Sequence, residues 1–426
     1  MIQINPSNIL KDKIGATHGI SQQALDNLCT KYQPLTQEVF RAKNKVGYDF
    51  LNLPDDSELL RKIKKFVTNQ NRYKWENIVV LGIGGSALGT IAVRSALISN
   101  YKRPRVFVVD NIDPQSISDL LSSINLSKTL FLVISKSGGT TEPMALYGLM
   151  RSELVKKKIR NFKKHFVFIT DPKKGLLRKI AKKDGIQTFD IPSKIGGRFS
   201  VLSSACLVPL VLAGVDVNGL LKGARVMREV IKSTKGTVNP ALLLAVSQFV
   251  MDRKKGKTMT VLMPYSNALF RVGDWYRQLL AESIGKNEKT GPTPINALGT
   301  TDQHSQLQLY TDGPNNKLII FLRVLKFNED PETGDQLPKE LSFLNNRKMS
   351  TLLDAAYFGT AGSLTHSKRP NLTIEVPKVD AKNIGALFML FEFQIALLGL
   401  LYKVDAFDQP GVEHSKQITK QLLSEL

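Results

Sequence analysis

Residues 133–143 combine four hydroxyl side chains with two adjacent glycines. An apolar run at 128–134 predicts a buried strand before them, and apolar residues at helical spacing over 143–156 predict a helix after them. Backbone N–H groups at the start of such a helix carry partial positive charge and bind anions. The loop therefore predicts a phosphate site, although a capped turn without a ligand has a similar composition. Its hydroxyl residues are Ser135, Ser137, Thr140 and Thr141.

A second loop of this kind, Gly82-Ile83-Gly84-Gly85-Ser86, follows a predicted strand at 77–81 and leads into a helix predicted to end at about Ser99. The same loop, with Ala87, matches the dinucleotide fingerprint, but Asp110 lies further along the chain than the usual ribose partner. Parallel strands place their carboxyl ends at one edge of a sheet, so the two loops should converge there. A dinucleotide does not need the second loop, whereas a compact sugar phosphate does.

Alternating strands and helices must position these loops, and they predict an α/β fold. We expect two units, each a parallel sheet sandwiched between helices, with a helical N-terminal segment and a C-terminal helix. Predicted strands lie at 77–81, 105–110, 128–134, 165–170, 187–191, 258–263, 317–325 and 371–376. The expected divisions of the chain are residues 1–55, 56–205, 206–402 and 403–426. An acidic, turn-rich stretch at 328–338 predicts a surface excursion.

The composition is that of a soluble globular protein, with 42% hydrophobic residues in 426, but the formal charge is +22. The basic residues are scattered in short clusters without interleaved aromatic residues, which disfavours nucleic-acid binding. The most apolar run, 386–402, contains Glu392 and Gln394, and this favours a buried helix over a membrane span. Two distant cysteines and no signal-peptide pattern at the start predict a cytoplasmic protein without a metal centre.

Six stretches, in this order along the chain, resemble motifs of the phosphoglucose isomerase family. They are Gly82-Ile83-Gly84-Gly85-Ser86, Ser135-Lys136-Ser137-Gly138-Gly139-Thr140-Thr141-Glu142, Ile195-Gly196-Gly197-Arg198-Phe199-Ser200-Val201, Ala281-Glu282-Ser283-Ile284-Gly285-Lys286, Gly299-Thr300-Thr301-Asp302-Gln303-His304-Ser305-Gln306 and Phe407-Asp408-Gln409-Pro410-Gly411-Val412-Glu413-His414-Ser415-Lys416. One departure is Gly139, where the family usually has a third hydroxyl residue.

The resemblance implies two sugar-isomerase (SIS) domains in a homodimer. It also implies a reaction of glycolysis and gluconeogenesis that needs neither metal nor cofactor. Glucose 6-phosphate and fructose 6-phosphate interconvert by ring opening and proton transfer between C2 and C1 through a cis-enediol. This chemistry needs one base that takes and returns a proton, an acid–base pair for the ring, and a cation for the enediolate.

The matching positions imply roles for individual residues. Glu282 matches the base, although an exposed helix glutamate paired with Lys286 four residues later is the competing interpretation. His304 matches the ring-opening acid–base residue, which in the family comes from the other subunit. Lys416 matches a lysine that assists ring opening, and Arg198 matches the residue that steadies the enediolate. The predicted substrate contacts are Gly84, Gly85, Ser86, Ser135, Lys136, Ser137, Thr140 and Gln409.

Three alternatives remain open from the sequence. A dual-specificity enzyme that also accepts mannose 6-phosphate is the nearest, although Gln409 resembles the glucose-specific family. A nicotinamide-dependent oxidoreductase would use residues 82–87 as its cofactor loop. A catalytically silent sugar-phosphate-binding regulator is the third, and the presence of Glu282, His304 and Lys416 together argues against it. We expect a sugar phosphate and a second copy of the chain as the only partners, with no nucleic acid and no membrane.

Overall fold

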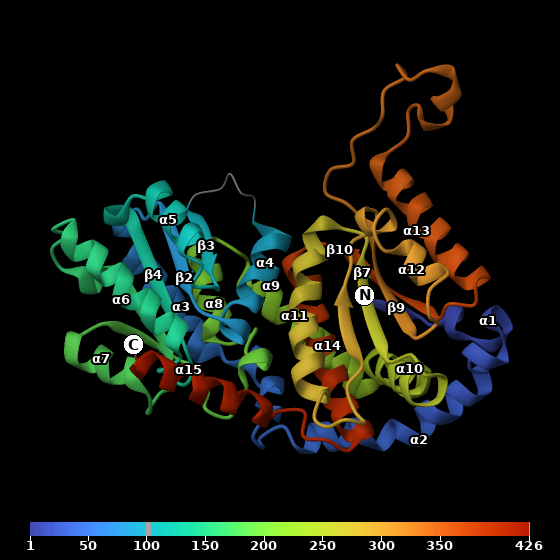
Figure 1. Cartoon of the computed structure of the whole chain (residues 1–426), viewed down its shortest axis with the longest axis horizontal. Coiled ribbons are helices and arrows are strands. Elements are labelled where there is room, and N and C mark those ends of the chain that lie inside the picture. The colour runs from blue at the N-terminus through green and yellow to red at the C-terminus, as the bar shows by residue number, and fades with distance from the viewer. Residues whose placement is uncertain (99–103, 426) are drawn as a thin grey trace.

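The computed structural model describes residues 1–98 and 104–425, and it has two five-stranded sheets side by side (Figure 1). All strands of the first sheet are parallel. They are β2 (Asn77–Leu81), β3 (Arg105–Val109), β4 (Thr129–Ile134), β5 (Phe166–Thr170) and β6 (Gln187–Asp190), in the order β3-β2-β4-β5-β6. The predicted parallel sheet is confirmed.

Helices cover both faces of this sheet. Side chains of β4 alternate between two hydrophobic clusters, with Leu130 and Leu132 on one face and Phe131 and Val133 on the other. This two-residue period explains why a strand buried on both faces is apolar throughout. One face packs against α3 (Ser57–Gln70), α4 (Leu88–Leu97) and α8 (Ser204–Leu212), and the other against α5 (Pro114–Ser123), α6 (Thr141–Lys156) and α7 (Leu176–Asp184). The predicted end of α4 at Ser99 lies outside the described residues.

The second sheet has four parallel strands and one antiparallel edge strand. They are β1 (Gln3–Asn5), β7 (Met259–Pro264), β8 (Thr293–Asn296), β9 (Lys317–Lys326) and β10 (Asn371–Lys378), in the order β1-β10-β9-β7-β8. One face packs against α12 (Leu307–Thr311) and α13 (Met349–His366). The other faces α10 (Pro240–Lys255), α11 (Asn267–Ile284) and α14 (Ala381–Tyr402).

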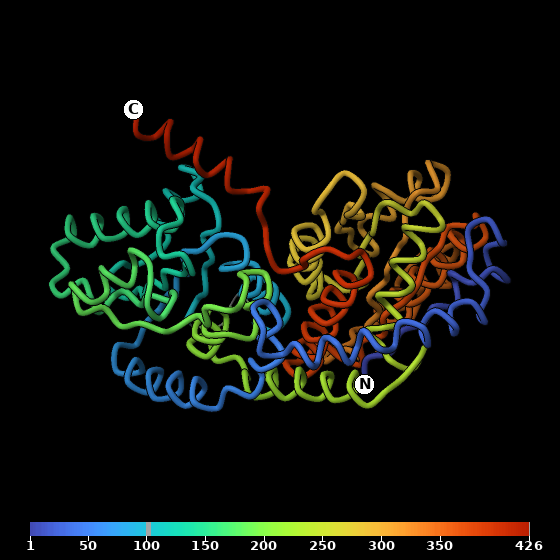
Figure 2. The backbone as a smooth tube through the Cα atoms, turned by 90° about the horizontal axis from the view of Figure 1, so that it is seen from below, coloured from blue at the N-terminus to red at the C-terminus, as the bar shows by residue number. Residues whose placement is uncertain are grey.

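The N-terminal segment is not wholly helical, because β1 pairs with β10. The rest of it includes α1 (Lys11–His18) and α2 (Gln22–Arg41), and α2 lies alongside α9 (Val217–Ser233) and against α10 (Figure 2). Residues 1–41 therefore extend the second sheet and its helical layer. The proposed divisions at 55, 205 and 402 stay a prediction.

The helix α14 runs through the centre of the protein. It is the one helix among the described residues that is long and apolar enough to cross a membrane, yet 94% of its most apolar window is buried inside the protein. Asp380 starts it by accepting a hydrogen bond from the Asn383 N–H. The amide nitrogen of its buried Gln394 donates to Gln248 and to the Tyr276 hydroxyl, whereas the amide oxygen has no partner in the described part of the chain. The expected buried core helix is confirmed.

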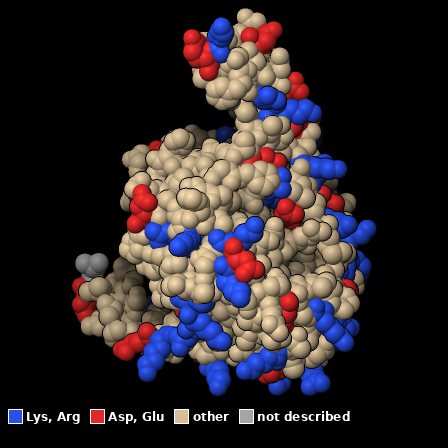
Figure 3. Space-filling view, turned by 90° about the vertical axis from the view of Figure 1, so that its right-hand side faces the viewer, with Lys and Arg blue, Asp and Glu red and all other residues tan. Residues whose placement is uncertain are grey.

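Two segments project from the body. Residues 327–348, which include the short helix Lys339–Leu344, rise above α13 (Figure 1). The last helix, α15 (Glu413–Glu425), stands apart from the body on the side of the first sheet (Figure 2). Its predicted last residue, Leu426, lies outside the described residues. On the face formed by the second sheet and its helices, Lys and Arg are spread between other residues rather than gathered into one patch (Figure 3).

Candidate active site

The first loop lies at the carboxyl end of β2 and presses against the turn that follows β6. Its residues Gly84–Ser86 form a short 3-10 helix, and Gly84 has a φ of 55°, which glycine adopts without strain. A Cβ on Gly85 would lie 2.2 Å from the carbonyl carbon of Gly197, so a side chain there would displace the backbone. Ser200 Oγ donates to the Gly197 carbonyl at 2.7 Å. The loop is therefore fixed directly beside Arg198.

The second loop lies at the carboxyl end of β4 and brings three hydroxyl groups together. Ser135 Oγ is 2.9 Å from Thr140 Oγ1, and Ser137 Oγ is 3.1 Å from the same atom. Thr140 precedes α6, but its side chain makes no capping bond to that helix. Hydroxyl groups rotate freely, so this triad can turn its donors toward a phosphate at the start of α6. A Cβ on Gly139 would meet no atom within 4 Å, so the missing family hydroxyl leaves open space.

Lys136 ties this second loop to the turn after β6. Its Nζ donates to the Ile195 carbonyl at 2.6 Å. Burial lowers the pKa of Lys136, and the neighbouring Asp171 opposes that change. In this structure the lysine therefore holds the two backbone segments together rather than facing the space between the loops. We refer to residues 82–86 and 135–140 as the hydroxyl loops.

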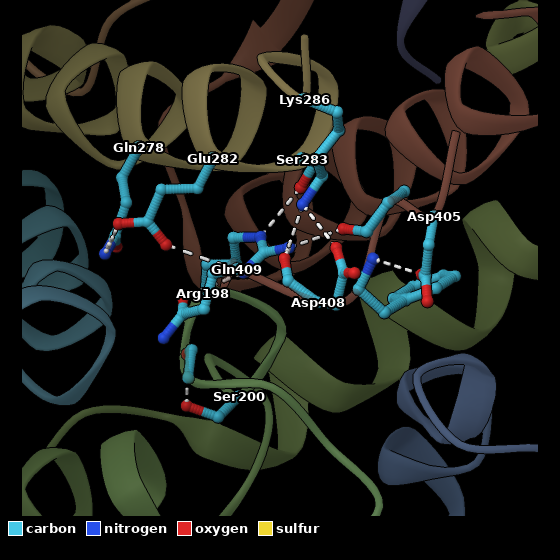
Figure 4. Close-up of polar contacts among 12 residues, drawn as sticks. Arg198, Ser200, Gln278, Glu282, Ser283, Lys286, Asp405, Asp408 and Gln409 are labelled. Atoms are coloured by element: carbon cyan, nitrogen blue, oxygen red, sulfur yellow. Dashed lines mark hydrogen bonds and ion pairs between the residues drawn. The ribbon is translucent and has the colours of Figure 1, made fainter. Parts of the chain in front are cut away.

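Arg198 is buried and has a partner for each nitrogen of its guanidinium (Figure 4). Nε donates to Ser283 Oγ at 2.7 Å, and Nη2 donates to the carbonyls of Ala406 and Asp408 at 2.6 and 2.8 Å. Nη1 donates to Gln409 Oε1 at 3.1 Å. Desolvation lowers the pKa of Arg198, and Glu282 leads the carboxylates that oppose this. An arginine that remains charged is thus held rigidly in place.

Glu282 lies in the last turn of α11 with its carboxylate held from two sides. Gln278 Nε2 donates to Oε1 at 3.0 Å, and Arg198 Nη1 lies 3.5 Å from Oε2. The side chain is 30% exposed, so a small molecule can reach it. Gln278 was not predicted from the sequence, although it lies one helical turn before Glu282 on the same face. Its Nε2 also lies 3.0 Å from where a Cβ on Gly84 would be, so Gln278 lies between Glu282 and the first hydroxyl loop.

The competing interpretation, in which Glu282 pairs with Lys286, is wrong for this structure. The helix ends at Ile284, and Gly285 has φ −74° and ψ 78°, so Lys286 does not continue the helical spacing. Its Nζ instead donates to the carbonyl of Asp408 and to Asp408 Oδ1, the latter at 2.8 Å. We refer to Arg198, Glu282, Lys286, Asp408 and Gln409 as the charged cluster.

His304 and Lys416 lie apart from this cluster within the chain. His304 follows the short helix Thr301–Gln303 and is exposed, and its imidazole has no hydrogen-bond partner in residues 1–98 and 104–425. Lys416 lies on α15 and pairs with Glu413 at 2.7 Å, with both side chains more than half exposed. The structure therefore brings Arg198, Glu282 and Gln409 together beside the hydroxyl loops, but not His304 or Lys416. Among the described residues no group of three or more His, Cys, Asp and Glu side chains could hold a metal ion.

Comparisons with known proteins agree with this architecture. The family model described as phosphoglucose isomerase matches residues 52–347 and 356–426. A glucose-6-phosphate isomerase of Carboxydothermus hydrogenoformans is 40% identical over 95% of this chain and 91% of its own length. A probable glucose-6-phosphate isomerase of Methanococcus maripaludis is 39% identical over 98% and 93%.

Two solved structures share the fold. A hypothetical protein of Thermus thermophilus superposes with a TM-score of 0.91 at 31% identity, and all of both chains is covered. A glucose-6-phosphate isomerase of Chlamydia trachomatis superposes with a TM-score of 0.82 over 94% of this chain and 85% of its own. At 23% identity, that second likeness bears on the fold alone.

Proposed function

The chain belongs to the phosphoglucose isomerase family, and on that premise we propose how its site divides the reaction among the residues described above. The chain is an aldose–ketose isomerase that interconverts D-glucose 6-phosphate and D-fructose 6-phosphate. The alternative of a nicotinamide-dependent oxidoreductase is not favoured. The individual roles below are proposals that rest on the geometry of the site.

The hydroxyl loops hold the phosphate. Ser135, Ser137 and Thr140 offer three hydroxyl donors within 3.4 Å of one another, at the start of α6. Neutral donors and a helix N-terminus bind a phosphate without needing a lysine or arginine. Ser86, with the backbone of Gly84 and Gly85, closes the site from the neighbouring strand end. The sugar then extends from the phosphate toward Arg198 and Glu282.

Within the charged cluster, Glu282 moves the proton and Arg198 stabilises the resulting charge. Once the ring is open, Glu282 takes the proton from C2. The electrons of that C–H bond form the C1–C2 double bond of the enediolate, and the electrons of the C1 carbonyl double bond move to the C1 oxygen. Arg198 Nη1, already directed toward Glu282 and Gln409, stabilises the developing oxyanion. A proton then passes from the C2 hydroxyl to the C1 oxygen. Glu282 returns its proton to C1 as the C2–O bond becomes the carbonyl, which gives the ketose. Gln278 keeps the carboxylate turned toward the sugar throughout.

Ring opening requires an acid and a base, and the described residues of one chain do not bring His304 or Lys416 to Glu282. We propose that His304 serves this step from a second copy of the chain in a homodimer, because it is exposed and lies apart from the cluster in its own chain. It would protonate the ring oxygen as the C1–O5 bond breaks. The C1 hydroxyl would give its proton to solvent, and the electrons of that O–H bond would form the C1 carbonyl. Lys416 would assist from α15, whose first residue follows four positions after Gln409. The compartment we propose is the cytoplasm.

The single observation that carries these roles is the position of the Glu282 carboxylate, held between Gln278 and Arg198 beside the hydroxyl loops. A coupled enzyme assay that offers glucose 6-phosphate and mannose 6-phosphate side by side tests the activity and its selectivity. We expect turnover of the glucose ester and little of the mannose ester. Equal turnover of both would establish the dual-specificity alternative, and turnover of neither would contradict the function.

A further inference from the structure

Lys286 lies outside the residues assigned to the reaction, yet it holds the same backbone turn as Arg198 (Figure 4). The side chain is 10% exposed, and its Nζ donates to both the carbonyl and a carboxylate oxygen of Asp408. Arg198 Nη2 donates to the same carbonyl at 2.8 Å. Two cations thus share one peptide oxygen.

That peptide oxygen belongs to the turn that presents Gln409. The Asp408 carbonyl is on the peptide bond that leads directly into Gln409, and Gln409 Oε1 accepts from Arg198 Nη1. From Asp408 to residue 425 every described residue is exposed. The shared carbonyl and the Gln409 amide that follows it are therefore the contacts that hold the start of this exposed C-terminal segment to buried Arg198.

The end of α11 explains why Lys286 points to this turn. Gly285 turns the chain out of the helix, and the Lys286 N–H bonds to the Ile284 carbonyl at 2.9 Å instead of continuing the helical pattern. A lysine this buried is costly unless its charge is paired, and Asp408 supplies that pairing. The side chain thus joins the helix that carries Glu282 to the segment that carries Gln409.

We propose that Lys286 is a positioning residue of the isomerase reaction, which fixes the Asp408 carbonyl and so keeps Gln409 beside Arg198 and Glu282. The inference rests on the proposed roles of those three residues. Charge-assisted hydrogen bonds are the strongest that a side chain makes to a peptide oxygen. A misplacement of about 1 Å near reacting groups can cost about 10²-fold in rate. Lys286 would act through this backbone turn, without touching the sugar.

The test variant is Lys286→Met, which keeps the long apolar stem and removes the charge. We expect turnover of glucose 6-phosphate to fall about 10- to 100-fold. Competitive inhibition by inorganic phosphate should stay within about threefold of the wild type, because the hydroxyl loops are separate from the turn. The variant should still fold, since Phe407 packs against Phe199 and Phe50 with ring centroids 4.9 and 6.4 Å apart. Lys286→Arg, which keeps the charge and the donors, should recover part of the turnover.

Lys317→Met is the matched control. Lys317 is also buried, and its Nζ likewise donates to a carbonyl, that of Pro314 at 3.1 Å, and to a side-chain oxygen, Asn316 Oδ1 at 2.8 Å. The partners of Lys317 lie outside the site. We therefore expect the turnover of the Lys317→Met variant to match that of the wild type, even if the melting temperature of the variant falls. Equal loss of turnover in Lys286→Met and Lys317→Met would mean that removing any buried lysine charge lowers turnover, wherever that lysine lies. This result would overturn the proposal.

A double-mutant cycle with Gln409→Ala tests the route. If Lys286 acts by placing Gln409, then Lys286→Met should cost less than about threefold in the Gln409→Ala background. If Lys286→Met lowers turnover in the Gln409→Ala background as much as it does in the wild type, the proposal is overturned. These outcomes can be distinguished from a failure of the proposed function. If the wild type is active and the Lys286→Met variant has the same turnover, only the positioning role is contradicted. A wild type that does not interconvert the two sugar phosphates contradicts the proposed function instead.

Discussion

The hydroxyl loops and the charged cluster lie side by side but are built in different ways. Each loop is one short stretch between a strand and a helix, and the donors of the second loop bond within five residues of one another. The cluster joins residues that lie 84 and 211 positions apart, such as Arg198 with Glu282 and with Gln409. The loops also use neutral donors, whereas the cluster uses full charges. A local structure is suited to binding, and an assembly of distant segments is suited to orienting a base and a cation against each other.

The largest expected effect comes from replacing Glu282, the proposed general base of the charged cluster. Glu282→Gln keeps the size of the side chain and an oxygen that can accept from Gln278, but removes the proton-accepting carboxylate. General-base catalysis contributes about 10²–10⁴-fold, so turnover should fall by at least that factor while inhibition by inorganic phosphate persists. Exchange of the C2 proton with solvent should fall in parallel. Unchanged C2 exchange in this variant would remove Glu282 as the base.

A subunit-mixing experiment tests whether the cluster is completed by a second chain. Inactive Glu282→Gln and His304→Ala proteins, mixed under conditions that exchange subunits, should regain activity. In a mixed dimer one of the two sites holds both native residues, so a random equal mixture should reach about a quarter of the wild-type activity. No recovery after proven exchange would mean that each chain supplies its own histidine.

A change in the second hydroxyl loop should affect binding rather than chemistry. Thr140→Val keeps the shape of the side chain and removes one donor to a charged ligand, which costs about 1.5–3 kcal/mol. The Michaelis constant should rise about 10- to 100-fold with turnover nearly unchanged. Thr141→Val, at the first position of α6, is the neighbouring control. A fall in turnover alone for Thr140→Val would remove the contrast between the two regions.

A carboxyl outside both regions gives the smallest predicted effect on the reaction, because it acts on the stability of the protein instead. Glu392 on α14 is fully buried, and neither carboxylate oxygen has a hydrogen-bond partner in the described part of the chain, so burial raises its pKa well above the ordinary value. The folded protein then holds this proton more tightly than the unfolded chain. Its stability should therefore fall as pH rises above the unfolded pKa of about 4.3, by about 1.4 kcal/mol per pH unit until the folded pKa is reached.

Urea unfolding between about pH 5 and pH 8 measures this slope. Glu392→Gln cannot ionise, so its stability should depend less on pH than that of the wild type. Glu340→Gln, on an exposed residue of the projecting segment, should leave the slope unchanged. The same slope in all three proteins would show that Glu392 does not titrate on unfolding.

The contrast between the two regions also explains what the sequence can predict. A strand, a glycine turn and a helix follow from neighbouring residues, so the hydroxyl loops and most strands are predictable. A spacing of four residues makes Lys286 a natural partner for Glu282, and only the end of α11 at Ile284 rules this out. The turn before Gln409 gives no local sign that its carbonyl binds two cations. Gln278 could have been found, since it shares a helical face with Glu282.

The edge strands escape prediction for a different reason. β1 has three residues and β8 has four, including Pro294, so neither shows the alternation or the apolar run that indicates a strand. Their pairing with β10 and β7 depends on the rest of the sheet being formed. His304 and Lys416 are predicted by resemblance alone, and their meeting with the cluster would depend on a second chain and on α15.

One hydrophobic cluster runs through both halves of the molecule, and this bears on how the protein unfolds. It includes Ile78 and Leu132 from the first sheet, Ile320 and Ile374 from the second, and Leu390 from α14 between them. Neither half can melt without exposing apolar surface of the other, so the two should lose structure together. Calorimetry of the protein should then give one heat-absorption peak. The van't Hoff enthalpy of unfolding should be close to the calorimetric enthalpy, as expected when both halves unfold as one cooperative unit. Two resolved peaks would mean that one half unfolds while the other stays folded, despite the shared cluster.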